Sequence, residues 1–326
     1  MTIETVVIGA RGYTGSELLP LLYHHPACTL RAVGSSSAAG ELLNQQVRGL
    51  QACALRFTDI RPGNLHQFPA DLYVLALPNG HAADYVEVAT KCRPEAVIID
   101  LSADYRFDDA WVYGQPEQRA QFIAGARRIA NPGCFATGAQ LALAPLVDRL
   151  ASTPVVFGVS GFSGAGKTPS RRNDPEVLKD NILPYVLADH LHEQEISRQL
   201  GCEVRFMPHV APFFRGISLT VAAELDGPAR PPELFEHFRD HYSESPLIKV
   251  QEEIPEVTMV RGTHGVIIGG FTSSRIHPRR LSLVCVLDNL LKGAATQVVQ
   301  NMNLAFGQEP LAGLDSDWTA QTGKSQ

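Results

Sequence analysis

The sequence predicts an α/β protein with two domains, a doubly wound parallel sheet followed by an α+β domain whose sheet is mainly antiparallel. Short aliphatic runs alternate with helical patterns through the first half of the chain. A glycine-rich turn follows the first of these runs. After about Thr153 the apolar residues of the runs partly alternate between two faces, as in a sheet that is covered on one side.

The first half contains four runs with the length and composition of strands buried on both faces: Thr5–Ile8, Leu30–Val33, Leu72–Leu77 and Ala96–Asp100. Helical patterns lie between them, at Ser16–His24 and Ala82–Lys91. Because strand–helix–strand repeats align their strands in one direction, these runs predict a parallel sheet.

The second half is predicted to contain strands at Pro154–Val159, Glu203–Phe206, Ile217–Leu225 and Leu281–Leu287. Its predicted helices are Asp189–Leu200, Pro232–Tyr242 and Asn289–Phe306. The polar tail after Gly307 is expected to be loose.

Composition favours a small-molecule function in the cytoplasm. The 326 residues are 44% hydrophobic and carry a formal net charge of −6, which gives no electrostatic reason to expect a nucleic acid or an anionic membrane as partner. The six cysteines are scattered without a C-x-x-C pair, so we expect neither a metal site nor disulfides. The uncharged run between Arg128 and Asp148 contains Pro132 and Pro145, which argues against a membrane span.

The stretch GFSGAGKT, Gly161 to Thr168, matches the phosphate loop of nucleotide triphosphatases. Such a loop must open a helix, but Pro169 follows at once and Pro175 leaves room for little more than one turn. We therefore interpret the stretch as a substrate-facing loop, with Ser163 and the cation Lys167 as candidate substrate-binding residues. A plain structural loop remains the alternative.

A second glycine loop, VVIGARGYTG, lies where a dinucleotide would bind in a Rossmann-like domain. Its three glycines, Gly9, Gly12 and Gly15, follow the first strand and open the first helix. The candidate cofactor-binding residues are these glycines with Arg11, Tyr13 and Thr14.

The end of the second strand distinguishes between the two nicotinamide dinucleotides. A carboxylate there would bind the ribose hydroxyl of NAD, but the chain has neutral side chains at Ser35 and Ser36, with Arg11 as a nearby cation. This pattern favours NADP(H) over NAD.

One cysteine has a reactive context. In NPGCFAT a turn precedes Cys134, so the thiol falls in the first turn of a helix, where the positive helix end favours a thiolate nucleophile. Four of the other cysteines (Cys28, Cys92, Cys202 and Cys285) lie in predicted strands or helices and are interpreted as buried small hydrophobic residues.

His209 and Arg215 lie in one predicted loop, after the strand Glu203–Phe206. A loop histidine is the usual partner of a nucleophilic thiol, although the residues alone do not distinguish His209 from the other ten histidines. Arg215 and Lys167 are the candidate cations for an acyl phosphate or a carboxylate.

Five separated segments, GARGYTG, NPGCFAT, SGFSGAGK, FMPHVAPFFRG and DNLLKGAATQVVQNMN, resemble the N-acetyl-gamma-glutamyl-phosphate reductase family, NADPH-dependent enzymes of arginine biosynthesis. The resemblance implies that Cys134 forms a thioester, that His209 is its acid/base partner, and that the protein is a homo-oligomer, either a dimer or a tetramer. It also implies a discontinuous NADP domain, residues 1–133 with 289–326, in which Asn289 contacts the cofactor, around a catalytic domain of residues 134–288.

The chain departs from the family pattern at three places. Family members commonly have a small residue at the position of Arg11, arginine at the position of Lys167, and His-Arg-His where this chain has His190-Leu191-His192. The third departure weakens any assignment of the His190 segment to the substrate.

The function implied is the reduction of N-acetyl-L-glutamyl 5-phosphate to N-acetyl-L-glutamate 5-semialdehyde, with release of phosphate. The same chemistry on aspartyl phosphate or on a carrier-linked aminoadipyl phosphate is the nearest alternative. A non-catalytic NADP-binding regulator and a triphosphatase are the alternatives from other classes.

Overall fold

The computed structural model describes residues 2–314, which form two compact units. The first consists of residues 2–132 with 294–314, and the second of residues 133–293. The prediction ended the second domain at Asp288, whereas residues 289–293 here belong to the second unit. Of the tail expected to be loose, residues 308–314 lie against the first unit, where Leu314 joins the apolar core, and residues 315–326 lie outside the described part.

The first unit contains the predicted doubly wound parallel sheet, with strand order β3-β2-β1-β4-β5-β7-β6. Its strands are β1 (Ile3–Ile8), β2 (Cys28–Gly34), β3 (Phe57–Thr58), β4 (Leu72–Leu75), β5 (Val97–Asp100), β6 (Val112–Tyr113) and β7 (Arg128–Ala130). All neighbours pair in parallel. Because the order reverses between β1 and β4, the carboxyl ends of these two strands form the edge at which such sheets bind ligands.

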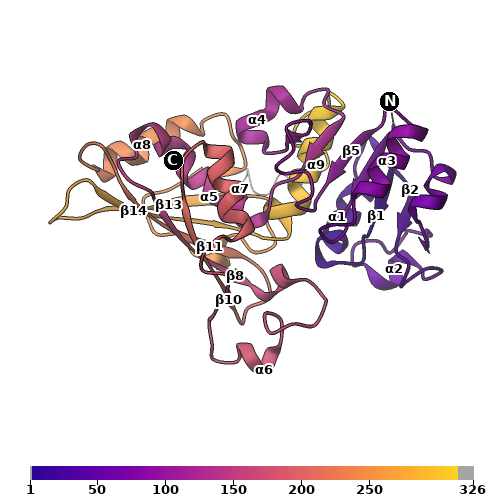
Figure 1. The fold of residues 1–326 in the computed structure, drawn as a ribbon, viewed down its shortest axis with the longest axis horizontal. Coiled ribbons are helices and arrows are strands. Elements are labelled where there is room, and N and C mark those ends of the chain that lie inside the picture. The colour runs from indigo at the N-terminus through magenta and orange to yellow at the C-terminus, as the bar shows by residue number, and fades with distance from the viewer. Residues whose placement is uncertain (1, 315–326) are drawn as a thin grey trace. The chain divides into compact units, whose positions relative to one another are not determined.

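Five helices flank this sheet: α1 (Tyr13–Tyr23), α2 (Leu43–Gln46), α3 (Ala83–Cys92), α4 (Pro116–Ile123) and α9 (Thr296–Ala305). Helix α9, in yellow in Figure 1, comes from the far end of the sequence and contacts α1, α4 and β5. Its Val298, Val299 and Met302 are fully buried in the same cluster as residues of β1 and β4. The predicted helix Asn289–Phe306 is divided, with a π turn at Leu291–Ala295 ahead of α9.

The second unit contains a mixed, mainly antiparallel sheet, as predicted, with strand order β12-β13-β14-β11-β8-β10-β9. Its strands are β8 (Val155–Gly161), β9 (Leu183–Pro184), β10 (Arg205–Ala211), β11 (Ile217–Glu224), β12 (Ile248–Val250), β13 (Val266–Ser273) and β14 (Arg280–Leu287). Its helices are α5 (Cys134–Leu143), α6 (Pro175–Leu178), α7 (Leu191–Leu200) and α8 (Pro231–His241). Short 3-10 turns lie at Pro62–Gln67 in the first unit and, in the second, at Ala144–Arg149, Phe162–Ala165 and Val257–Met259.

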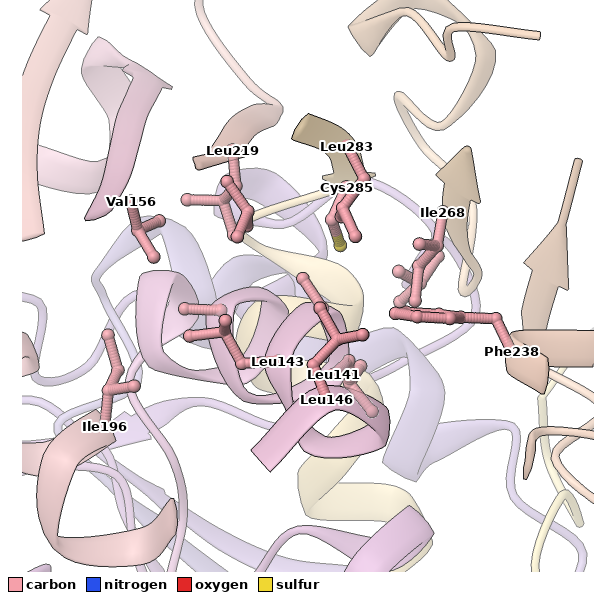
Figure 2. Packing of buried hydrophobic residues seen from close by; sticks show 14 of the residues in the cluster. Leu141, Leu143, Leu146, Val156, Ile196, Leu219, Phe238, Ile268, Leu283 and Cys285 are labelled. Carbon is pink, nitrogen blue, oxygen red and sulfur yellow. The ribbon is translucent and has the colours of Figure 1, made fainter. Parts of the chain in front are cut away.

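Helix α5 lies at the centre of the second core, and every residue of it after Cys134 is buried. Figure 2 shows Leu141 and Leu143 of α5 facing side chains of the sheet, among them Leu219 and Cys285. A β-carbon at Gly138 would lie 2.6 Å from the Leu219 side chain, so glycine is required for the helix to approach the sheet this closely. The first residue of α5, Cys134, is thus held by a rigid core.

The buried carboxyl of Asp100, the last residue of β5, gives the first unit a pH-dependent stability. It accepts hydrogen bonds from the Ser102 amide (3.2 Å) and hydroxyl (2.5 Å), but burial dominates and raises its pKa to about 6. Since the pKa is raised on folding, the folded state holds the proton more tightly than the unfolded state, and stability falls as the pH rises from about 4 to about 6.

Asp100→Asn is therefore expected to gain stability relative to the parent as the pH rises. Asparagine removes the buried charge, and the gain between pH 4 and pH 8 should be about 2.5 kcal/mol. Urea unfolding at both pH values would measure it, with the exposed Asp108→Asn as control. A difference between variant and parent that stays constant with pH would contradict the raised pKa.

Candidate active site

Cys134 is the first residue of α5, and Gly133 is the helix N-cap, with extended backbone angles. The Asn131-Pro132-Gly133 turn has backbone angles that a helix cannot include, so α5 begins at Cys134. A β-carbon at Gly293 would lie 2.8 Å from the Cys134 β-carbon, so only glycine leaves room for the cysteine there. Cys134 is partly exposed.

A cavity of about 40 Å³ opens beside this thiol, lined entirely by residues of the second unit. Its walls come from the start of α5, from the loop after β8 and from the segment that leads into α7. The side chains there with polar or ionisable groups are Cys134, Ser160, Arg172, Tyr185 and His192. A cavity of this size accommodates a small polar group beside the nucleophile.

Helix α7 brings a histidine and a carboxylate to the start of α5. His192 lines the cavity with Cys134, and its ring centroid lies 5.8 Å from that of Phe135. One turn later on the same face, Glu195 is fully buried and its Oε1 accepts the Gly133 amide at 2.9 Å. The two helices are therefore joined beside the thiol. The sequence prediction left this segment unassigned, although the spacing of His192 and Glu195 was a usable signal.

His190 has a structural role at the start of α7. Its Nδ1 accepts the His192 amide at 3.0 Å and caps the helix, which requires an unprotonated Nδ1. Burial, followed by the Arg172 charge, lowers the pKa of His190, consistent with a neutral ring.

The structure does not bring His209 to Cys134. The prediction placed His209 in a loop because it lies between Pro208 and Pro212, but Pro208 and His209 lie within β10, between β8 and β9. Phe206 and Val210 face α5 and the cavity, so the alternation of side chains puts His209 on the opposite face. There the centroid of its ring lies 4.3 Å from that of Phe157, with the two rings tilted by 42°, and Nδ1 lies 3.1 Å from the Met207 carbonyl oxygen.

Arg215 is engaged by a buried carboxylate. Its Nε and Nη2 donate to Asp288 at 2.6 and 2.9 Å, and Asp288 is fully buried. This two-point ion pair fixes the chain after β10 against the end of β14. Arg215 is not among the residues that line the cavity.

Of the two candidate substrate-binding residues in the loop after β8, Lys167 is exposed and Ser163 is buried. Lys167 is exposed in a bend, and the next helix, α6, begins only at Pro175, so the helix that a phosphate loop requires is missing at Lys167. Ser163 is buried, and its hydroxyl accepts from Asn289 Nδ2 at 2.9 Å. Asn289 Oδ1 accepts the Gly216 amide at 2.7 Å, so both polar ends of Asn289 hold together segments of the second unit.

The glycine loop of the first unit has the geometry that a dinucleotide needs. Gly9 has φ +83°, and a β-carbon there would lie 2.5 Å from the Ala76 carbonyl oxygen. A β-carbon at Gly15 would lie 2.2 Å from the carbonyl oxygen of Ala10. Around Gly12, the N-cap of α1, the described residues leave open space, so a pyrophosphate could approach the amides of the Tyr13 and Thr14 turn.

Arg11 lies over the serines that follow β2. Its Nη1 donates to the Ser37 hydroxyl at 2.9 Å. Ser35 is buried and donates its amide to the Thr58 carbonyl, whereas Ser36 and Ser37 are exposed. Ser37 belongs to the run of neutral hydroxyl side chains, Ser35 to Ser37, that follows the second strand. Arginine and hydroxyl groups at this position fit a phosphate better than a ribose hydroxyl.

Residues 2–314 contain no group of histidine, cysteine or acidic side chains arranged to hold a metal ion. Over these residues no helix is long and apolar enough to cross a membrane.

Family models and solved structures match both units. Residues 4–126 match the model described as "Semialdehyde dehydrogenase, NAD binding domain", and residues 134–289 match "Semialdehyde dehydrogenase, dimerisation domain". Aspartate semialdehyde dehydrogenase II from Vibrio cholerae has the same fold, with a TM-score of 0.78 and 20% identity over 94% of this chain and 99% of that one. The fold and the cysteine site thus define a semialdehyde dehydrogenase, an oxidoreductase with a nicotinamide-binding domain.

Curated relatives narrow the class. N-acetyl-gamma-glutamyl-phosphate reductase of Xanthomonas campestris is 48% identical over 96% of this chain and all of its own length. The enzyme of the same name from Xylella fastidiosa is 47% identical over 96% of this chain and 93% of its own. The chain belongs to the N-acetyl-gamma-glutamyl-phosphate reductase family.

Proposed function

We infer that this enzyme reduces N-acetyl-L-glutamyl 5-phosphate to N-acetyl-L-glutamate 5-semialdehyde and releases phosphate, as a step of arginine biosynthesis. The observation that carries the inference is Cys134 at the start of α5, sharing a small cavity with His192. The names and full-length similarity of the curated relatives support the choice of substrate.

The first half of the reaction uses Cys134 and His192. The sulfur bonds to the acyl carbon while the bond from that carbon to the phosphate oxygen breaks, which leaves a thioester on Cys134. His192 accepts the thiol proton and passes it to the departing phosphate. Glu195 accepts a hydrogen bond from the Gly133 amide and thereby fixes the position of His192 on α7 relative to Cys134 on α5.

In the second half the thioester carbonyl would accept a hydride, which NADPH would supply when held by the glycine loop at Gly9, Gly12 and Gly15. The resulting oxyanion on Cys134 re-forms its carbonyl, the carbon–sulfur bond breaks, and the aldehyde leaves. The Cys134 thiolate regains a proton from solvent, so one proton is consumed for each turnover. The α5 N-terminus, which lies beside the thiolate, stabilises it as the leaving group.

The reverse reaction tests this function. N-acetylglutamate semialdehyde and NADP are expected to give NADPH only when phosphate is present, because phosphate must cleave the thioester. Formation of NADPH without phosphate would indicate an ordinary aldehyde dehydrogenase. If the enzyme turns over aspartate semialdehyde or aminoadipate semialdehyde instead of the N-acetylated compound, the substrate of the forward reaction would be the corresponding acyl phosphate.

We propose NADP(H) as the cofactor, bound at Gly9, Gly12 and Gly15, with its 2′-phosphate near Arg11. Arg11→Ala should raise the KM for NADPH by about 10-fold or more and leave that for NADH nearly unchanged, since only NADPH carries the extra phosphate. Steady-state kinetics with both cofactors would measure this, and Arg31→Ala, on β2, is the matched control. Equal losses with both cofactors would contradict the assignment.

We further propose a homo-oligomer, a dimer or tetramer, that acts in the cytoplasm. The sheet face opposite α5 is exposed at Phe157, Thr220 and Ala222, and the domain that carries it matches a model named for dimerisation. All six cysteines are free thiols, which suits a reducing compartment. Sedimentation at the mass of one chain, 35.4 kDa, would contradict the oligomer.

A further inference from the structure

The loop between β13 and β14, residues 274–279, presents a large apolar side chain to solvent. Ile276 is 83% exposed, which makes it the most exposed large hydrophobic side chain among residues 2–314. In Figure 1 this hairpin extends beyond α8 and the rest of the second unit. Single exposed apolar residues are common on proteins, but this one is held in a fixed position and is flanked by arginines.

Hydrogen bonds hold the loop in one shape. The His277 amide donates to the Ser274 hydroxyl at 3.0 Å, and the Pro278 carbonyl oxygen accepts from the Ala229 amide, just before α8, at 2.7 Å. Because the loop is already ordered, little conformational entropy would be lost when Ile276 enters a binding partner.

The arginines beside Ile276 differ in their partners. Arg279 lies 4.0 Å from Glu224 and donates to the Leu225 carbonyl oxygen at 2.6 Å. Arg275 and Arg280 are exposed, and within the described part of the chain neither forms an ion pair. The tip of the hairpin therefore combines one apolar side chain with two cations that have no counter-charge.

A groove of about 190 Å³ lies at the base of the same hairpin. Its walls are Pro231, Pro232 and Phe235 of α8, Phe271 of β13, and Glu252, which follows β12. Pockets for drug-sized ligands are larger, roughly 300–1,000 Å³. The size and the mainly apolar walls of this groove suit a single aliphatic side chain.

The rim of the groove is acidic. Glu252 and Glu253 are exposed and, over residues 2–314, form no ion pair. Ile254 comes next and is 64% exposed, so the rim also offers apolar surface. An apolar groove with two carboxylates at its rim is complementary to an isoleucine flanked by two arginines.

We propose that Ile276 of one chain enters this groove on a second copy of the chain, with Arg275 and Arg280 against Glu252 and Glu253. The chain's own Ile276 does not fill its groove, since this side chain is exposed to solvent. A second copy supplies the matching apolar side chain and both charges, so no further partner is needed.

Two-fold symmetry would form both contacts at once. Ile276 follows Phe271 by five residues, a distance of at most about 17 Å along a strand. With a hairpin tip and a groove this close on each chain, a two-fold axis between them seats each tip in the partner's groove and closes the assembly.

This contact is separate from the sheet face proposed above for self-association. Phe271 packs on Phe238 of α8, in the same core cluster as α5, whereas the proposed sheet face lies opposite α5. The hairpin contact would thus join two sheet-face dimers into a tetramer. It goes beyond the proposed reaction and does not depend on it.

Sedimentation velocity of Ile276→Asp tests the contact. The variant should lose one association step, with the Kd of that step raised by about 100-fold or more, because an aspartate would replace the apolar anchor and face carboxylates. Phe157→Asp, on the other face, should keep this step. A parent that sediments at the same mass as Ile276→Asp over the same concentrations would overturn the proposal and leave the groove to a different partner.

Charge reversal in mixed chains tests the pairing itself. Arg275→Glu and Glu252→Arg should each raise the Kd of this step by about 10-fold or more, because like charges meet in both contacts. An equal mixture of the two variants should associate to within about 3-fold of the parent, since opposite charges then meet in both contacts. Arg171→Glu, exposed in the loop after β8, is the matched control and should not rescue Glu252→Arg. A mixture no stronger than the separate variants would contradict the proposed pairing.

Discussion

Cys134→Ser is expected to lower kcat by about 10⁴-fold or more while the Kd for NADPH stays within about 2-fold of the parent. A serine hydroxyl at this position is not ionised at neutral pH, so the acyl transfer that precedes hydride transfer is lost. Cofactor binding persists because the glycine loop belongs to the first unit and Cys134 to the second.

Stopped-flow or steady-state assays in both directions would measure the turnover, and fluorescence titration would measure the Kd. Cys92→Ser is the matched control, because Cys92 is exposed at the end of α3 rather than buried as predicted. Turnover by Cys134→Ser at more than about one hundredth of the parental rate would remove the thioester from the mechanism.

His192→Gln is expected to lower kcat by about 10²- to 10⁴-fold, whereas His209→Gln should retain it to within about 3-fold. His192 lines the cavity with the thiol and can exchange its proton, while His209 lies against Phe157 on the opposite face of the sheet. The alkylation rate of Cys134 as a function of pH provides a second readout, because loss of a proton acceptor displaces the profile.

His209→Gln needs one control of its own, since Phe157 and His209 lie on the face proposed for self-association. Sedimentation of this variant separates loss of assembly from loss of chemistry. A large loss of kcat in an assembled His209→Gln, with a nearly normal His192→Gln, would restore the acid/base role that the family resemblance implied for His209.

The elements that the sequence predicted well are those in which one residue pattern has one physical solution. Continuous aliphatic runs such as Leu72–Leu75 bury both faces only in a parallel sheet, and the first glycine loop opens α1 because Gly9 and Gly15 leave no room for side chains. The Asn131-Pro132-Gly133 turn likewise predicted Cys134 as the first residue of α5, because proline and glycine there cannot belong to the body of a helix.

The elements that were missed depend on distant partners. The prolines on both sides of His209 suggested a loop, but pairing with β8 and β9 keeps β10 extended through Ala211, so the face on which His209 lies could not be predicted from the local sequence. The role of His192 follows from α7 docking on α5 through Glu195 and Gly133, which lie far apart in the sequence. Arg215 was a reasonable candidate cation until its partner Asp288 was located.

The position of α9 in the chain has a consequence for the order of biosynthesis. The first unit takes Val298, Val299 and Met302 from a helix that the ribosome makes only after all of the second unit. Until then, the apolar side chains of α1 and β5 that this helix contacts remain open to solvent or to chaperones. The catalytic unit, whose residues are contiguous, can close its core first, and the nucleotide-binding unit is completed last.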